Sequence, residues 1–163
     1  MHKLFLICFF SMIFSFFSVR ASEQVEMRIR GTLRAPPPCK INDGGVVAVE
    51  FGSRIGINKV DGINYRQVIS YRITCEPTES VPWTMLLTLK GTATSFDNAA
   101  LKTDNDSLGI RIYQGDVRFE LNSGIKIDPK NPPRLEAVPV AKPSVPLEEG
   151  EFTATAMLQA DYF

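Results

Sequence analysis

The stretch GEFTATAMLQADYF (residues 150–163) decides the fold that we expect. Apolar or small side chains recur at every second position, which is typical of a β-strand with one face toward a core. This first set is Phe152, Ala154, Ala156, Leu158, Ala160 and Tyr162, and the residues between them are Thr153, Thr155, Met157, Gln159 and Asp161. Phe163 follows directly, so we expect no later strand to cover this one. An uncovered apolar edge beside an open groove promotes aggregation unless a partner fills it.

Short alternating segments of the same kind precede this strand, and no segment has the period of an amphipathic helix. The expected strands are residues 46–51, 65–75, 83–89, 108–113, 135–140 and 152–162. Residues 104–106 and 128–133 are rich in Asp, Asn and Pro and therefore read as loops. Trp83 shares a strand face with Met85 and Leu87, which favours core packing over an exposed binding site. The pattern predicts an all-β, antiparallel sandwich. An immunoglobulin-like sandwich would need one more strand after residue 162.

A spare strand lies near the N-terminus. The segment 23–35 alternates apolar or small residues with polar and mostly charged ones. The first set is Val25, Met27, Ile29, Gly31 and Leu33. Pro36-Pro37-Pro38 follows at once and forms a stiff, extended spacer. The segment is either an edge strand of the same sandwich or an arm that inserts elsewhere, and the spacer favours the arm.

Residues 1–21 are typical of a secretory signal peptide. Lys3 precedes an apolar run from Leu4 to Phe17, and Val19-Arg20-Ala21 resembles a cleavage site. The run is shorter than the roughly 20 residues of a membrane span, although a retained anchor is the alternative. Cleavage removes Cys8 and leaves Cys39 and Cys75. Two cysteines in an exported chain predict a disulfide.

Composition argues against an enzyme and against a nucleic-acid binder. The 163 residues suit one domain, and 18 Lys+Arg balance 18 Asp+Glu, so no basic patch is expected. The one histidine, His2, lies in the predicted signal peptide, which excludes histidine-dependent nucleophiles and histidine metal sites from the mature chain. The carboxylate pairs Asp104/Asp106 and Glu148/Glu149 lie in hydrophilic loops, and Leu108 stands where a calcium loop needs an oxygen ligand. We therefore expect no catalytic residue, no metal and no cofactor.

Several features in this order resemble the subunits of chaperone–usher pili, the relatives of type 1 and P pili. The glycine-centred arm Ile29-Arg30-Gly31-Thr32-Leu33 leads through prolines into the first cysteine, and the second cysteine ends the segment 71–75. Leu108-Gly109-Ile110 matches a family segment. Gly150 is the fourteenth residue from the end and Tyr162 the penultimate one. Each element alone is weak, but together they are specific and span the mature chain.

The resemblance implies an incomplete immunoglobulin-like β-sandwich that lacks its last strand. Residues 1–21 are then the signal peptide, 22–38 an N-terminal donor-strand extension, and 39–163 the pilin domain. The donor strand is Val25, Met27, Ile29, Gly31 and Leu33. The strand that lines the groove and binds the chaperone is Gly150, Phe152, Ala154, Ala156, Leu158, Ala160, Tyr162 and Phe163. The expected partners are a periplasmic chaperone, an outer-membrane usher and neighbouring pilins, joined by β-augmentation.

The resemblance leaves the place in the fibre open. The chain has no room for the second domain of an adhesin, and its short loops and balanced charge favour a minor tip or adaptor subunit of a fimbrium on the bacterial surface, exported through the periplasm. A major rod pilin is the first alternative. A self-contained, secreted carbohydrate-binding sandwich is the second, and it would be stable and soluble without any partner.

Overall fold

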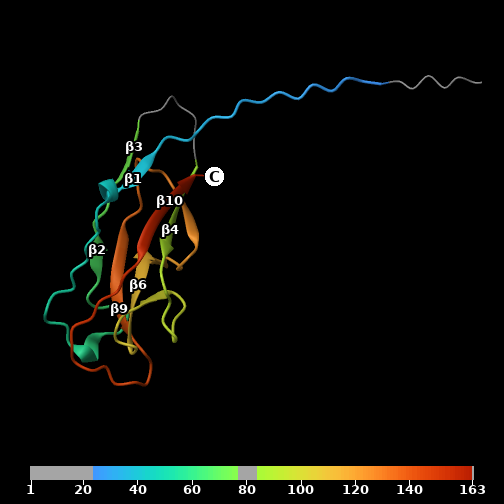
Figure 1. Ribbon diagram of the computed structural model, residues 1–163. Helices are drawn as coiled ribbons and strands as arrows, with labels where there is room; N and C mark the ends of the chain where they lie inside the picture. The colour runs from blue at the N-terminus through green and yellow to red at the C-terminus, as the bar shows by residue number, and fades with distance from the viewer. Residues whose placement is uncertain (1–23, 77–83, 163) are drawn as a thin grey trace, which may run out of the picture. The chain divides into compact units, whose positions relative to one another are not determined.

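The computed structural model describes residues 24–76 and 84–162. The chain divides into two units, residues 1–34 and 35–163. The second unit is built of β-strands joined by loops and two short 3-10 turns (Figure 1). Its strands are β1 (Cys39–Ile41), β2 (Gln67–Ile69), β3 (Ile73–Cys75), β4 (Met85–Lys90), β5 (Ala100–Lys102), β6 (Leu108–Gln114), β7 (Val117–Arg118), β8 (Gly124–Ile127), β9 (Leu135–Ala141) and β10 (Met157–Tyr162). The turns are η1 (Asn42–Gly44) and η2 (Ile57–Lys59).

The strands form three antiparallel sheets. The largest has the order β2-β9-β6-β5, with β7 paired to β6, and a second sheet has the order β10-β4-β8. β1 and β3 form a third, two-stranded sheet. β10 is an edge strand, because it pairs with β4 along one side from Met157↔Lys90 to Tyr162↔Met85 (Figure 1).

The core lies between the two larger sheets. Alternating residues of β4, β5, β6 and β9 meet there, and Phe119 fills the space beside them. Met85 and Leu87 of β4 are fully buried, as the alternation from Met85 to Leu89 requires. These buried residues account for much of the stability, since each fully buried large apolar side chain contributes about 1.5–3 kcal/mol.

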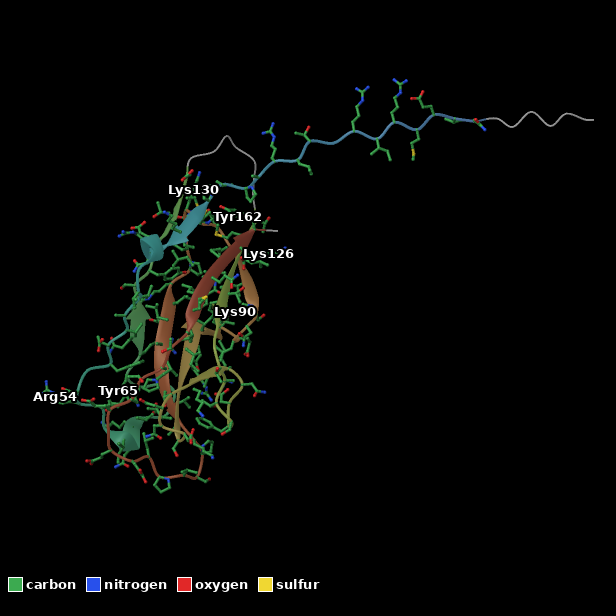
Figure 2. All side chains as sticks on the ribbon, in the orientation of Figure 1. Arg54, Tyr65, Lys90, Lys126, Lys130 and Tyr162 are labelled. Atoms are coloured by element: carbon green, nitrogen blue, oxygen red, sulfur yellow. A yellow bond between two sulfur atoms is a disulfide. The ribbon has the colours of Figure 1, made fainter. Side chains whose placement is uncertain are left out.

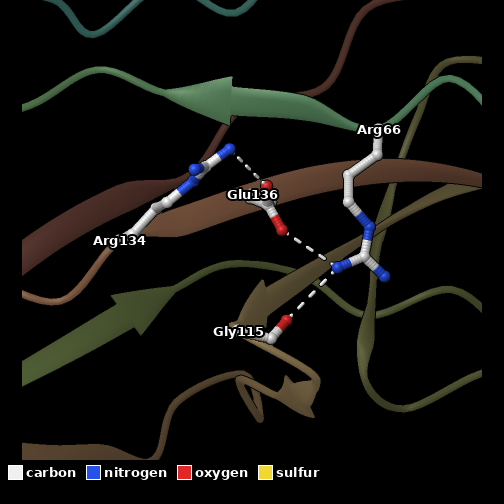
Figure 3. Close-up of polar contacts among 4 residues, drawn as sticks. All are labelled: Arg66, Gly115, Arg134 and Glu136. Atoms are coloured by element: carbon white, nitrogen blue, oxygen red, sulfur yellow. Dashed lines mark hydrogen bonds and ion pairs between the residues drawn. The ribbon is translucent and has the colours of Figure 1, made fainter.

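An arginine and glutamate cluster fixes the outer edge of the large sheet. Arg66, just before β2, contacts Glu136 of β9 at 2.9 Å and the carbonyl of Gly115 at 3.2 Å (Figure 3). Arg134 donates to the other oxygen of the same carboxylate at 2.9 Å. The hydrogen bond from Arg66 lowers the pKa of Glu136, with Arg134 adding to the effect. The cluster therefore ties the short strand β2 to its neighbours.

Three predicted strands differ from the observed ones. The segment 152–162 is a strand only over β10 (Met157–Tyr162), and the part before it has an isolated bridge at Ala154. The segment 65–75 is divided into β2 and β3, which belong to different sheets, and Tyr71 between them donates its hydroxyl to the carbonyl of Pro133 at 2.6 Å. Residues 46–51 form no strand, although Val47, Val49 and Phe51 are half-buried. No described segment forms a ladder with them, so their alternation has no β-partner. The predicted position of Trp83 lies outside the described residues.

Candidate functional site: an apolar groove along the C-terminal strand

A groove with a volume of about 1790 Å³ opens above the core of the second unit. One wall is the C-terminal segment 147–158, and the other is the segment 44–60 that precedes β2. The floor consists of apolar side chains of the two large sheets. These are Leu89, Leu101, Leu108, Ile110, Ile112, Leu135, Ala137 and Pro139. These floor residues are themselves buried, with at most 6% of their surface exposed, so the groove lies directly against the core.

The C-terminal wall carries the predicted alternation. Phe152, Leu158 and Ala160 pack against the core cluster, while Met157 is 65% exposed. Ala154 and Ala156 line the groove but are exposed, because no strand lies over them. Gly150 lines the groove too, whereas Ala160 and Tyr162 lie beyond it. Thr153 and Thr155, which the alternation predicts to face away from the groove, also contribute atoms to its wall, as does Met157.

Hydrogen bonds between Asp104 and Thr153 hold the first half of this wall, and one of them runs from the backbone N–H of Asp104 to the carbonyl of Thr153 at 3.2 Å. The carboxylate of Asp104 accepts hydrogen bonds from the backbone N–H and the hydroxyl of Thr153, both at 2.9 Å. These bonds lower the pKa of Asp104. Thr103 pairs with Ala154 in an isolated bridge beside them. This contact was not predicted, because Asp104 and Thr153 are far apart in the sequence and nothing in the loop 104–106 signals it.

The second wall lacks a strand but is anchored at several points. Tyr65 accepts a hydrogen bond from the backbone N–H of Gly56 at 2.9 Å (Figure 2). Phe51 reaches across to Phe152 of the opposite wall, with ring centroids 5.9 Å apart and ring planes inclined at 44°. The sequence predicts a strand at residues 46–51, but it does not predict that this segment is part of a groove wall.

A disulfide lies beside the last residues of the C-terminal strand. Cys39 of β1 and Cys75 of β3 are bonded, as the sequence predicted, and they face each other in the antiparallel pair. Tyr162, at the end of β10, places its hydroxyl against the sulfur of Cys39 (Figure 2). Burial raises the pKa of Tyr162. Phe163 and the predicted signal peptide lie outside the described residues.

The predicted donor strand belongs to the first unit, of which the structure describes residues 24–34; we call this segment the arm. Its apolar side chains are exposed: Val25 84%, Met27 79%, Ile29 83% and Leu33 102%. Arg28 pairs with Glu26, two residues away, through an N–O contact of 2.6 Å. No residue of the arm is in a helix or strand. The arm thus presents four uncovered apolar side chains to solvent.

Nothing in the described ranges resembles a catalytic or metal centre. Asp104 holds Thr153, and Asp106 pairs with Lys102 at 3.1 Å, so both carboxylates of that loop have structural partners. Residues 24–76 and 84–162 contain no group of three or more metal-ligating side chains. Within the same ranges, no helix has the length and apolar character to cross a membrane.

Comparison with known proteins identifies the family. Residues 27–162 match the model of the fimbrial protein family. The chain is a fimbrial protein. This assignment confirms the resemblance seen in the sequence, and the family is a structural one without enzymatic activity.

Fimbrial relatives cover most of the chain. Two uncharacterized fimbrial-like proteins of Escherichia coli (strain K12) are similar to it. YfcQ is 39% identical over 141 residues, which cover 84% of this chain and 86% of YfcQ. YfcR is 37% identical over 150 residues, which cover 89% of this chain and 85% of YfcR.

Two solved pilus subunits share the fold. The P pilus adaptor subunit PapF superposes with a TM-score of 0.58 at 27% identity, over 78% of this chain and 97% of PapF. The P pilus rod subunit PapA gives a TM-score of 0.59 at 16% identity, over 85% of this chain and 100% of PapA. The predicted all-β, incomplete immunoglobulin-like sandwich of this fimbrial protein is confirmed.

Proposed function

We propose that this fimbrial protein is a minor tip or adaptor subunit of a chaperone–usher fimbria, which polymerises by donor-strand exchange and supports cell adhesion. The observation that carries the proposal is the groove. It lies over buried apolar core residues between the segments 44–60 and 147–158, and the second of these segments leads into β10, which is an edge strand. A β-strand that enters there would gain main-chain hydrogen bonds from that edge and bury alternate side chains on the floor.

The arm has the properties of the strand that another subunit would receive. Its apolar side chains alternate, are exposed, and are not part of any sheet. In this proposal a periplasmic chaperone fills the groove first, and the arm of a neighbouring pilin replaces it at an outer-membrane usher. The mature fibre then stands on the bacterial surface.

Likeness to PapF and the sequence itself support the minor role. The P pilus adaptor subunit PapF is 27% identical to this chain, and the charges of this chain are balanced. Immunogold labelling of fibres distinguishes the roles. Label confined to fibre tips supports a minor subunit, whereas label along the whole shaft indicates a rod pilin.

A groove variant tests the donor-strand function directly. We expect Ala154→Glu to prevent co-purification with a co-expressed periplasmic chaperone, since an unpaired carboxylate in an apolar groove costs several kcal/mol. Val117→Glu is the matched control, because Val117 is 70% exposed on β7 and does not line the groove. Equal recovery of chaperone complexes from both variants would contradict the proposal.

A further inference from the structure

We propose that residues 45–51 form a flap that bridges the groove of the free subunit, and that this flap must move away before any partner strand can enter. The contact that holds the flap in place is the one between Phe51 and Phe152. This inference rests on the proposed function and adds to it a barred state of the subunit, which exists before any partner is bound.

The apolar floor of the groove is already covered in the free subunit. Its side chains are at most 6% exposed. The cover comes from the two walls of the groove: Val49 and Phe51 pack against the core cluster from one wall, and Phe152 and Leu158 from the other. The chain itself therefore keeps water from the apolar surface that a partner strand would have to reach.

One aromatic contact bridges the groove. The rings of Phe51 and Phe152 come from opposite walls, with centroids 5.9 Å apart and planes inclined at 44°. Tilted rings at this separation are in contact and attract each other. A strand cannot run along the groove while these two rings touch, so the contact both stabilises the flap and bars entry.

The flap is held by its side chains and hardly at all by its backbone. Gly45 donates its N–H to the carbonyl of Asn42, and the carbonyl of Val46 accepts from the side chain of Asn42, both at 2.9 Å. Among the described residues, none forms a hydrogen bond with the backbone of residues 47–51. Segments with so few backbone partners open at low free energy.

Two glycines bound the flap. Gly44 and Gly52 both have a φ of 82°, a conformation that residues with a side chain rarely adopt. A Cβ atom added to either would meet no atom within 4 Å, so packing does not explain the two glycines. Their backbone conformation does, and a few such residues at the ends of a segment commonly serve as hinges.

The chain on either side of the flap is fixed. Asn42 donates its backbone N–H to the carbonyl of Arg72 at 2.8 Å, and Gly56 donates its own to the hydroxyl of Tyr65 at 2.9 Å. Residues 45–51 can thus move as one unit between two anchored points. A partner that binds only the open form is captured at a rate that opening limits, and its apparent affinity falls with the open fraction.

The first test needs no partner. The mature chain is mixed at low concentration with the dye ANS, which binds exposed apolar surface. We expect Phe51→Ala to bind several-fold more dye than the wild type, and Phe51→Leu, which keeps an apolar side chain but loses the ring contact, to lie between them. Val117→Ala, on β7 outside the groove, is the control and should match the wild type. Equal dye binding by the wild type and both Phe51 variants would overturn the inference.

The second test measures capture of the mature chain by a purified periplasmic chaperone, in stopped flow and with the chaperone in increasing excess. We expect the observed rate for the wild type to level off at high chaperone concentration, because opening of the flap becomes limiting. Phe51→Leu should raise this plateau about threefold to tenfold, which corresponds to the loss of one aromatic pair. Val117→Ala should leave it unchanged.

The outcomes separate the flap from the proposed function. A wild-type rate that keeps rising linearly with chaperone concentration, or a plateau that Phe51→Leu does not raise, overturns the flap and leaves the proposed function intact, since capture still occurs. Absence of capture in all variants contradicts the proposed function, and the dye measurement then decides on the flap by itself. Should Phe51→Ala fail to fold, Phe51→Leu supplies the dye comparison.

Discussion

At the scale of single residues, one tyrosine hydroxyl ties the segment between β2 and β3 to the loop before β9. Tyr71 lies between β2 and β3, and its hydroxyl donates to the carbonyl of Pro133 at 2.6 Å. Burial raises the pKa of Tyr71 to about 12, from an ordinary value of 10.0. The folded chain therefore retains this phenolic proton at a pH where the unfolded chain loses it.

This difference predicts a loss of stability at alkaline pH. Because the folded pKa of Tyr71 is the higher one, its contribution is complete below about pH 10 and is lost as the pH rises toward about 12. We expect Tyr71→Phe to flatten the pH dependence of the free energy of unfolding over that range. Urea denaturation of the wild-type protein and of Tyr71→Phe at several pH values measures this free energy of unfolding. The pKa of Tyr162 is shifted in the same direction, so Tyr162→Phe serves as the comparison. An unchanged slope in Tyr71→Phe would show that Tyr71 does not carry the effect.

At the scale of elements, the two halves of the C-terminal strand differ. Residues 157–162 pair continuously with β4, whereas the half before them is held by the Asp104–Thr153 contact and the bridge from Thr103 to Ala154. Backbone groups with few partners open at low free energy. The C-terminal segment is thus continuously hydrogen-bonded over residues 157–162 and has few hydrogen bonds over the half before them.

Hydrogen exchange should reveal this division. We expect slow exchange for the β10 amides that bond to β4, and fast exchange over residues 150–156 apart from Thr153. Asp104→Ala should release the amide of Thr153, while Asp106→Ala should not, because Asp106 pairs with Lys102 instead. Acid should have the same effect as Asp104→Ala. The pKa of Asp104 is depressed, so its contribution holds above the ordinary pKa and is lost as the pH falls through the lowered value. Uniform protection over residues 150–162 would contradict this description.

The elements also show what sequence patterns can and cannot predict. The alternation of apolar and polar residues predicted β4, β6 and β9 correctly, because the apolar side chains of these strands pack into the core. It failed for residues 46–51, where the same alternation is present but no described strand pairs with it. Strand formation depends on a neighbour as well as on a pattern. The Phe51–Phe152 and Asp104–Thr153 contacts join distant segments and have no local signal.

At the scale of the molecule, the groove has no strand over its floor, and the arm has no sheet to join. The groove lies over core side chains and leads to the edge strand β10, and the arm has an exposed apolar face that belongs to no sheet. The cysteines, the arm and the C-terminal alternation could all be predicted from the sequence. The depth of the groove could not, because it depends on how the walls 44–60 and 147–158 lie over the floor.

Joining the two parts in one polypeptide tests their fit. We expect the mature chain with its own residues 22–35 appended after Phe163, through a short flexible linker, to be monomeric and more stable than the mature chain alone. A short linker lets the appended strand return antiparallel to β10, whereas a parallel strand would need a crossover of a dozen or more residues. Burial of several apolar side chains, each worth about 1.5–3 kcal/mol, should raise the midpoint of thermal unfolding by roughly 10 °C or more. The matched control carries Ile29→Asp and Leu33→Asp in the appended copy, which keeps the length but places charges over the apolar floor. Equal unfolding temperatures for the two fusions would mean that the groove does not bury this face of the arm.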